Sequence, residues 1–450
     1  MKTYRSIAFL FCGLVGLLAF QNCSQINFSG TTSNSKLVVD PIPTPTDTPV
    51  NPKSTPKYVK LVGNDSVGPA RQIDSVGINS AGNQILAGGM GDDSYNGAVW
   101  AFRLIDGEWI QQGTKLIGSD HVGESYLGGS VAISGDGKTG VFGGRQDTPM
   151  PDLGFGVAMG AAWVFLNSDD DGSWVQQGAK LIGNDPYNSD LKQGCSVSLS
   201  GDGNALIVGA LNDNNHHGAA RVFNRANGIW KQSGPKFSGN NESGYSAQGN
   251  AVAISFDGTT AIVGGTNDSN SQGGAVWIFT KTADGWLQQG SKLTANDATI
   301  CNQQGANLGI SVALSADGNT AAVGGYNDNC GKGAIWIFVR QNGIWHQEGS
   351  KLVGEGGLGL SSQGTAVAIN ADGTMVVTGA PKDNGSHGAI WIYKKENGSW
   401  SQFGAKMIDP DGNANGFFGK SVSLSADGKT LVTTGMENST KIGFAWVFNL

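Results

Sequence analysis

Acidic residues recur at one repeated position and are the first candidates for chemistry. Seven stretches share a turn that ends in glycine, and ten residues after six of these glycines stands an aspartate. The six are Asp92, Asp147, Asp213, Asp268, Asp328 and Asp383. A ring of carboxylates would hold cations or a basic partner. Alternatively, each carboxylate accepts hydrogen bonds from its own loop as an Asx turn. Because the seventh stretch has Asn438, which keeps that capacity without the charge, we predict the local structural role.

The histidines and serines form no recognisable catalytic pattern. The five histidines, His121, His216, His217, His346 and His387, include no H-E-x-x-H motif and no pair spaced by four. No G-x-S-x-G elbow is present either. We therefore predict surface histidines and no catalytic residue. The acidic run at residues 168–172 is more typical of a solvated turn than of a metal site, so we predict neither a metal nor a cofactor.

Four of the five cysteines follow the N-terminal apolar run. Cys195 falls in a predicted strand, where we expect a buried thiol. Cys301 and Cys330 fall in two loops that should emerge on the same face of the fold. A disulfide between Cys301 and Cys330 is therefore expected in an oxidising compartment.

The twelve tryptophans occupy two repeated positions. Six lie in a third predicted strand, namely Trp100, Trp163, Trp277, Trp336, Trp391 and Trp446. Six begin a fourth strand, namely Trp109, Trp174, Trp230, Trp286, Trp345 and Trp400. Stacking on carbohydrate is one possible role, but recurrence in nearly every copy favours packing between repeats. Arg221 stands where the third copy would have its first tryptophan.

These positions belong to a unit of four short strands that occurs seven times. The turn glycines mark the period; they are Gly82, Gly137, Gly203, Gly258, Gly318, Gly373 and Gly428. In the cleanest copy the strands fall at 312–315, 320–324, 334–339 and 345–353, and an Asp-Gly turn joins the first two. The sequence therefore predicts an all-β, seven-bladed β-propeller of four-stranded antiparallel blades.

The two ends of the chain predict how the ring closes. The seventh copy stops at Leu450 without a fourth strand, whereas residues 60–65 nearly repeat residues 180–185 of the second copy. We expect this N-terminal strand to complete the last blade, which leaves no open seam.

Several copies resemble FG-GAP repeats, the units of the integrin α-subunit propeller and of many bacterial surface proteins. Phe418-Gly419 matches the "FG" and residues 379–381 (Gly-Ala-Pro) the "GAP", and residues 174–181 are similar to a bacterial subtype of the repeat. The resemblance covers residues 58–450. It implies calcium loops of D-x-D-x-D-G type between the first two strands. The matching turns here, such as Ser134–Gly137, carry one carboxylate each, so we expect no calcium there.

Composition limits the possible partners. The formal net charge is −7, charged residues are 14% of the chain, and no basic cluster is present to neutralise phosphates. We expect no nucleic-acid partner. The 71 glycines suit a protein with many tight turns.

The N-terminal segment has the features of an export signal. A basic start precedes an apolar run of 14 residues, Ile7 to Phe20, that ends near Cys23. This predicts a signal peptide at 1–22, of bacterial lipoprotein type with a lipidated Cys23, although residues 20–22 depart from the usual lipobox. The alternative is an ordinary secreted or periplasmic protein. Residues 23–57, rich in Pro, Ser and Thr, predict a tether, and residues 58–450 the propeller.

Function is expected where the copies differ. The second copy carries an insertion at 148–159, whose Thr148, Met150, Phe155 and Met159 are candidate binding residues. We expect a monomeric, non-enzymatic lipoprotein of the outer membrane or cell surface that binds a protein or glycan and touches the membrane only through its lipid. The alternatives are a polysaccharide-acting enzyme with its site at one end of the ring and a purely structural envelope protein.

Overall fold

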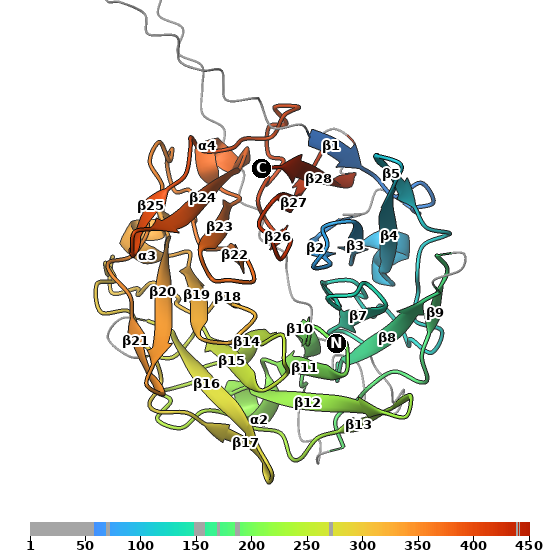
Figure 1. Ribbon diagram of the computed structural model, residues 1–450, viewed down its shortest axis with the longest axis horizontal. Coiled ribbons are helices and arrows are strands. Elements are labelled where there is room, and N and C mark those ends of the chain that lie inside the picture. The colour runs from blue at the N-terminus through green and yellow to red at the C-terminus, as the bar shows by residue number, and fades with distance from the viewer. Residues whose placement is uncertain are drawn as a thin grey trace, which may run out of the picture. The chain divides into compact units, whose positions relative to one another are not determined.

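Seven four-stranded sheets follow one another in a ring around a central axis. The computed structural model describes residues 58–68, 73–147, 158–168, 172–184, 190–269, 273–437, 440 and 442–450. Figure 1 looks along the axis and shows the sheets placed round it in chain order. Every paired strand within a sheet is antiparallel. The predicted seven-bladed, all-β propeller is confirmed.

The first four blades each run from an innermost to an outermost strand. Blade 1 contains β2 (Ser75–Ile78), β3 (Gln84–Gly89), β4 (Ala98–Ile105) and β5 (Glu108–Gln111). Blade 2 contains β6 (Ser130–Ile133), β7 (Thr139–Gly144), β8 (Ala161–Asn167) and β9 (Trp174–Gln176). Blade 3 contains β10 (Gln193–Leu199), β11 (Ala205–Ala210), β12 (Ala219–Ala226) and β13 (Ile229–Gln232). Blade 4 contains β14 (Gln248–Ile254), β15 (Thr260–Gly265), β16 (Ala275–Thr282) and β17 (Gly285–Gln288).

The remaining blades keep the same order, except that the last one ends with the first strand of the chain. Blade 5 contains β18 (Ser311–Leu314), β19 (Thr320–Gly325), β20 (Ala334–Gln341) and β21 (Ile344–Gln347). Blade 6 contains β22 (Ala366–Ile369), β23 (Met375–Ala380), β24 (Ala389–Glu396) and β25 (Ser399–Gln402). Blade 7 contains β26 (Val422–Leu424), β27 (Thr430–Met436), β28 (Gly443–Asn449) and β1 (Tyr58–Leu61).

The N-terminal strand closes the ring as the sequence predicts. β1 pairs with β28 from Tyr58 opposite Phe448 to Leu61 opposite Ala445. Tyr58 lies edge-on to Trp446, with 5.3 Å between ring centroids, and Lys60 Nζ lies 4.1 Å from the centroid of Phe444. Blade 7 is therefore built from both ends of the propeller.

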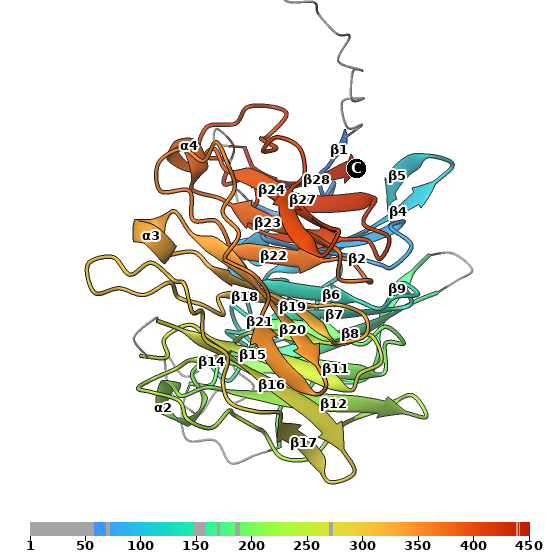
Figure 2. The same cartoon turned by 60° about the vertical axis from the view of Figure 1, so that its left-hand side comes forward.

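Four one-turn elements join the second and third strands of their blades. They are α1 (Asp92–Tyr95), α2 (Asp213–His216), α3 (Asp328–Gly331) and α4 (Asp383–Ser386). Their middle residues are left-handed, as at Asp93 with φ 47°. Figure 2 shows α2, α3 and α4 on one side of the ring and the turn from β4 to β5 on the other. We call the side with the second-to-third-strand loops the upper face and the other side the lower face.

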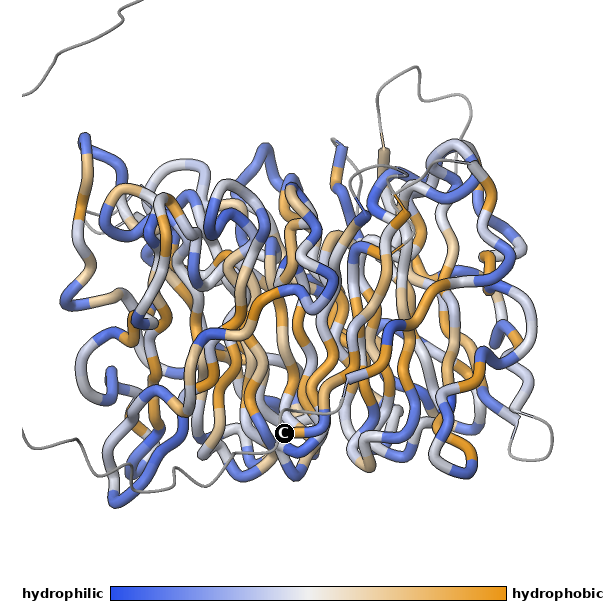
Figure 3. Tube along the Cα trace, turned by 90° about the horizontal axis from the view of Figure 1, so that it is seen from above, coloured by the Kyte–Doolittle hydropathy of each residue, from blue (hydrophilic) through white to orange (hydrophobic). Residues whose placement is uncertain are grey.

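The apolar core lies in the contacts between neighbouring blades. The six third-strand tryptophans are 0–3% exposed. Trp336 packs in one cluster with Ile262 and Ile278 of the preceding blade. The fourth-strand tryptophans pack at the edges of the same clusters, as Trp109 and Trp174 do. Figure 3 shows apolar strands through the middle of the ring and polar loops at both ends. The prediction that the tryptophans serve packing is confirmed.

A circle of seven backbone hydrogen bonds joins the blades on the lower face. One residue of each first turn donates its N–H to the carbonyl of the same residue in the next blade, at 2.8–3.1 Å. The members are Ser80, Gly135, Gly201, Phe256, Ala316, Ala371 and Ala426. Six of them are small, and a side chain at Gly201 would collide with the ring of Phe256. Because all seven of these backbone N–H groups donate within the circle, none of them is available to bind a partner at the axis.

Among the residues that the structure describes, no helix is long and apolar enough to cross a membrane.

Candidate binding face

The upper face is built from two kinds of loop. Each blade contributes the loop between its second and third strands and the segment that precedes its first strand, which we call the leading loop. The two loop types touch directly: Tyr126 N–H in the leading loop of blade 2 donates to the Tyr95 carbonyl of blade 1 at 2.9 Å. Loops of neighbouring blades therefore form one continuous surface.

The six recurring aspartates are buried and paired with lysines. Each is at most 1% exposed. The pairs are Asp92–Lys115, Asp147–Lys180, Asp213–Lys236, Asp268–Lys292, Asp328–Lys351 and Asp383–Lys406. Five of the Nζ–Oδ distances are 2.6–2.8 Å. Because each carboxylate is neutralised beneath the surface, these residues do not form an open acidic ring for cations.

The same carboxylates also fasten the leading loops. Asp92 Oδ1 accepts the Val67 N–H at 2.7 Å, and Asp147 Oδ1 accepts the Val122 N–H at 2.7 Å. Both donors belong to the leading loop of the same blade, not to the loop of the aspartate itself. The predicted Asx turn is therefore wrong, although the structural role holds. In each of these six copies the lysine stands four residues after a glutamine, as in Gln111 and Lys115, and that spacing was the available sequence signal.

Blades 3 and 7 show how the arrangement varies. In blade 3, Arg221 replaces the tryptophan, is fully buried, and donates from Nη2 to Asp213 Oδ2 at 2.7 Å. In blade 7 the aspartate is replaced by Asn438, which lies outside the described residues. The corresponding lysine there, Lys60, pairs instead with Asp411 at 2.6 Å. Lys60 therefore pairs with a carboxylate from another position in the blade where the recurring aspartate is absent.

A second acidic series, which the sequence analysis missed, binds the buried indoles. Trp100 Nε1 donates to Asp65 at 2.7 Å, and Trp163 and Trp336 donate to Asp120 and Asp297 at 2.8 Å. Burial alone would raise the pKa of these carboxyls, but the backbone and indole N–H donors hold it below the ordinary value. Each aspartate precedes its tryptophan by more than thirty residues, so no local pattern reveals the pair.

In the turns between the first and second strands, the aspartate accepts hydrogen bonds from neighbouring residues of its own turn. Asp136 Oδ1 accepts the Ser134 hydroxyl at 2.6 Å and the Lys138 N–H at 2.9 Å. The same pattern recurs at Asp202 and Asp317. Each turn offers one carboxylate that is already bonded, which does not suit the six to eight oxygens that calcium takes. Within the described ranges, no group of three or more His, Cys, Asp or Glu could hold a metal ion.

Aromatic side chains distinguish individual blades on the upper face. Tyr95 and Tyr126 stack with 5.1 Å between ring centroids, and Tyr95 is 44% exposed. Tyr126 and Phe417 occupy the same leading-loop position, with φ 56° and 49°. The other described members of this position, all left-handed, are Lys192, Ala247, Asn307 and Ser362. Bulky residues rarely adopt this conformation without compensation.

Two predicted surface histidines lie in a polar cluster beside an exposed tyrosine. His217 Nδ1 lies 2.7 Å from Glu242 Oε1, and Gln248 Nε2 donates to Glu242 Oε2 at 3.0 Å. Tyr245 is 65% exposed and lies edge-on to His217, with 5.6 Å between centroids. His216 Nδ1 lies 3.1 Å from Asn212 Oδ1. The cluster is confined to blades 3 and 4.

A disulfide joins Cys301 and Cys330, whose Cα atoms are 5.0 Å apart. It ties the leading loop of blade 5 to α3. Cys195 lies in β10, where burial raises the pKa of its thiol to about 11 and makes the thiolate scarce at neutral pH.

The insertion in blade 2 is only partly described. Thr148, Met150 and Phe155 lie outside the described residues, as does Cys23. Met159 is 1% exposed, and its carbonyl accepts the Gln193 N–H at 2.9 Å. The expectation that Met159 contacts a partner is therefore wrong, because this residue is packed beneath the start of β8.

Comparison with known proteins adds one relationship. No family model matches the chain. Integrin alpha-6 of Gallus gallus is 25% identical over 286 residues, which cover 57% of this chain and 26% of the integrin. The chain thus spans about a quarter of the length of this relative. The match and the seven four-stranded blades fit an FG-GAP-like propeller.

Proposed function

We propose that this protein is a non-enzymatic binding propeller of the bacterial cell envelope, anchored by lipid on Cys23, which captures a protein or glycan partner on its upper face. The similarity to an integrin α chain supports a binding role. The partner's identity and the anchor are parts of the proposal and rest on the sequence features described above.

One observation carries the choice of face: aromatic residues there, of which Tyr95 and Phe417 are exposed and Tyr126 is partly buried, adopt conformations that cost free energy. Tyr95, Tyr126 and Phe417 all have φ between 49° and 70°. A bulky residue in the left-handed region costs of order 1–3 kcal/mol, and such strain clusters at ligand sites. Asparagine adopts this conformation more readily, as Asn307 does at the same position. We infer that contact with a partner offsets the free-energy cost of an aromatic side chain at these positions.

The aromatic residues also suit recognition chemically. Tyrosine presents a large rigid surface with a polar tip at little entropic cost, which is why it is enriched in binding surfaces. Tyr95, Tyr126 and Tyr245 come from three different blades, so the surface is not a by-product of the repeat. The recurring acids, by contrast, are neutralised below it.

The test replaces rings without disturbing the backbone. In the double variant Tyr126→Asn and Phe417→Asn, each position receives the residue best suited to its φ, so the melting temperature should stay level or rise. Capture of envelope proteins by cross-linking, or of glycans on an array, should fall at least tenfold. Phe256→Ala, which removes a 50% exposed ring from the lower face, is the matched control and should bind as the unmodified protein does. Unchanged capture by the double variant, or loss in the control alone, would contradict the proposal.

A further inference from the structure

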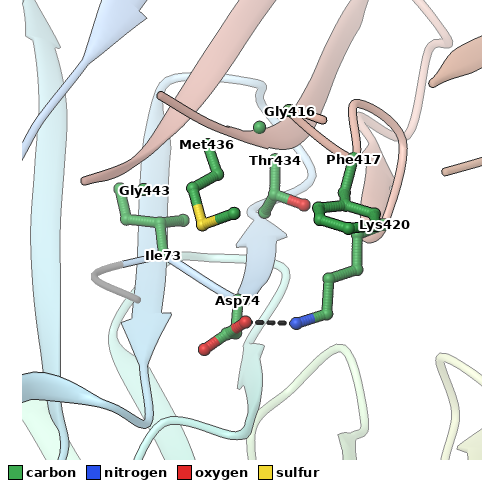
Figure 4. Close-up of a pocket in the computed structure, with 9 residues that line it drawn as sticks. Ile73, Asp74, Gly416, Phe417, Lys420, Thr434, Met436 and Gly443 are labelled. Carbon is green, nitrogen blue, oxygen red and sulfur yellow. Dashed lines mark hydrogen bonds and ion pairs between the residues drawn. The ribbon is translucent and has the colours of Figure 1, made fainter. Parts of the chain in front are cut away.

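A cavity of about 200 Å³ lies where blade 7 meets blade 1, on the upper side of the ring. Its walls are Ile73, Phe417, Thr434 and Met436, together with the backbone of three glycines at 416, 435 and 443. Asp74 and Lys420 form its charged part (Figure 4). Cavities that hold drug-sized ligands measure about 300–1,000 Å³. This one accommodates a single side chain or a fragment of that size.

The charged part comes from one repeat position in two neighbouring blades. Asp74 and Lys420 each stand two residues before the valine of their first strand. The other blades have Gly129, Cys195, Asn250, Ile310 and Thr365 at this position. The Lys420 ammonium donates to Asp74 Oδ1 across the seam. An ion pair at this position occurs at this seam because only here do adjacent blades carry opposite charges.

The carboxylate is incompletely satisfied. The Asp74 side chain is 7% exposed, and its Oδ2 is buried with no hydrogen-bond partner among the described residues. A buried acceptor without a donor costs about 1–3 kcal/mol, more when it is charged. The Lys420 side chain is 40% exposed, and its ammonium has three donors. The pair therefore offers a ligand one acceptor and at least one donor, side by side.

Charge selects the kind of group that fits. A cationic ligand would be attracted by the Asp74 carboxylate but repelled by the neighbouring Lys420 ammonium. An anionic ligand would be attracted by Lys420 and repelled by Asp74. A neutral group that donates and accepts from adjacent atoms satisfies both partners without a new net charge in a buried place. A peptide group has this property, since N–H and C=O are both obligatory hydrogen-bonding groups.

The walls select the rest of the ligand. Ile73 is 4% exposed and Phe417 36%, and with Met436 they form an apolar surface next to the ion pair (Figure 4). Methionine adapts its shape to different apolar groups. Thr434 Oγ1 already accepts the Ser421 N–H at 3.0 Å, so these walls offer few partners for the several hydroxyls of a sugar, whereas an aliphatic side chain would bury against them.

We propose that this cavity binds one aliphatic residue of a partner polypeptide: its side chain contacts Ile73, Phe417 and Met436, its main-chain N–H donates to the Asp74 carboxylate, and its carbonyl accepts from Lys420. The inference rests on the proposed function and makes its partner a protein. The cavity would then favour partners that carry an aliphatic residue at the position that enters it.

The test measures binding of three blocked tripeptides, acetyl-Gly-X-Gly-amide with X = Leu, Ser or Arg, and of methyl glucoside, to the full chain by ligand-detected NMR. The Leu peptide should bind with a millimolar Kd, at least fivefold tighter than the other three probes. Tightest binding of the Arg peptide, tightest binding of the sugar, or no binding of the Leu peptide would overturn the inference.

Variants localise the binding. Met436→Trp fills the cavity and should weaken the Leu peptide at least fivefold. Met90→Trp, at the same repeat position of blade 1, is the matched control and should bind normally. Should Met436→Trp fail to fold, Phe417→Asn suits the left-handed backbone, removes one apolar wall of the cavity and should weaken the Leu peptide at least threefold. Equal binding by the cavity variant and its control would place the peptide elsewhere.

The two proposals fail separately. The tripeptides test the cavity alone. The upper face is tested by whether Tyr126→Asn abolishes capture of a whole partner. Capture of that kind without binding of the Leu peptide would leave the proposed function standing and remove this inference.

Discussion

At the scale of single residues, buried Asp–Lys pairs recur in six blades. Asp383, which is fully buried, accepts the Leu358 N–H at 2.6 Å and Lys406 Nζ at 2.8 Å, so both carboxylate oxygens are occupied. Removing one partner of a buried pair leaves an uncompensated charge, which costs far more than the intact pair contributes.

The first prediction concerns the cost of removing the lysine alone from such a pair. Lys406→Met should lower the free energy of unfolding by about 3 kcal/mol, because Asp383 stays buried without its cation. Urea unfolding monitored by tryptophan fluorescence measures the change. Adding Asp383→Asn to the same protein should restore more than half of it, as the natural Asn438 of the seventh copy suggests. A double variant as unstable as the single one would show that the charge is not the cause.

One part of the pH dependence of stability comes from the carboxylates that bind indoles. The folded protein holds the pKa of Asp65, Asp120 and Asp297 below the ordinary value, where burial is outweighed by N–H donors. Their contribution is complete above the unfolded pKa of about 3.9 and is lost as the pH falls through the lower folded pKa.

The second prediction is that the melting temperature stays level from pH 7 to about 5 and falls progressively below pH 4. Asp297→Asn should lower the melting temperature at pH 7 and make the acid limb shallower. Asp106, in an exposed turn, provides a control whose substitution should leave the acid limb unchanged. Parallel acid limbs for Asp297→Asn and the unmodified protein would contradict the assignment.

At the scale of elements, the closing strand β1 decides whether the ring is complete. It contributes four paired residues to blade 7, and the segment after it reaches blade 1 through Asp65 and Trp100. β1 therefore connects the last blade to the first.

The third prediction compares two truncations. A chain beginning at Val62 lacks β1 and should lose about 3–4 kcal/mol of stability, at about 1 kcal/mol for each hydrogen bond of the lost pairing. A chain beginning at Tyr58 lacks the same upstream residues, keeps β1 and should match the full chain. Differential scanning calorimetry measures both. Equal melting temperatures would show that β1 does not support the ring.

At the scale of the whole molecule, the seven blades form a support whose recurring residues serve packing, and we propose that the aromatic exceptions of the upper face contact a partner. Asp74 and Lys420 are 346 residues apart and meet because the ring closes. The aromatic residues of the upper face likewise come from separate blades.

The fourth prediction concerns the proposed anchor. Cys23→Ser should move the protein from the membrane fraction to the soluble fraction, because a single cysteine would carry the lipid. Detergent phase partitioning of the expressed protein measures this. Cys12→Ser, within the apolar run, is the control and should remain with the membrane. Unchanged partitioning of Cys23→Ser would remove the lipoprotein proposal.

The sequence of this protein determines the blades, because local patterns encode them. Alternating apolar residues define each strand, the Asp-Gly turns with left-handed glycines such as Gly318 set each hairpin, and the copy near Lys60 predicts closure. Tryptophan packing was also predictable, since a residue that recurs in nearly every copy is expected to serve the contact between copies.

Tertiary structure alone decided which loops meet and which charges pair. Asp92 and Lys115 are each visible in the repeat, but their partnership depends on how a blade folds back on itself. The burial of Met159 likewise depends on tertiary contacts, and Asp74 meets Lys420 only because the ring closes. The physical reason is that hydrophobic periodicity is a local property of the chain, whereas burial and ion pairing depend on contacts between segments far apart in sequence.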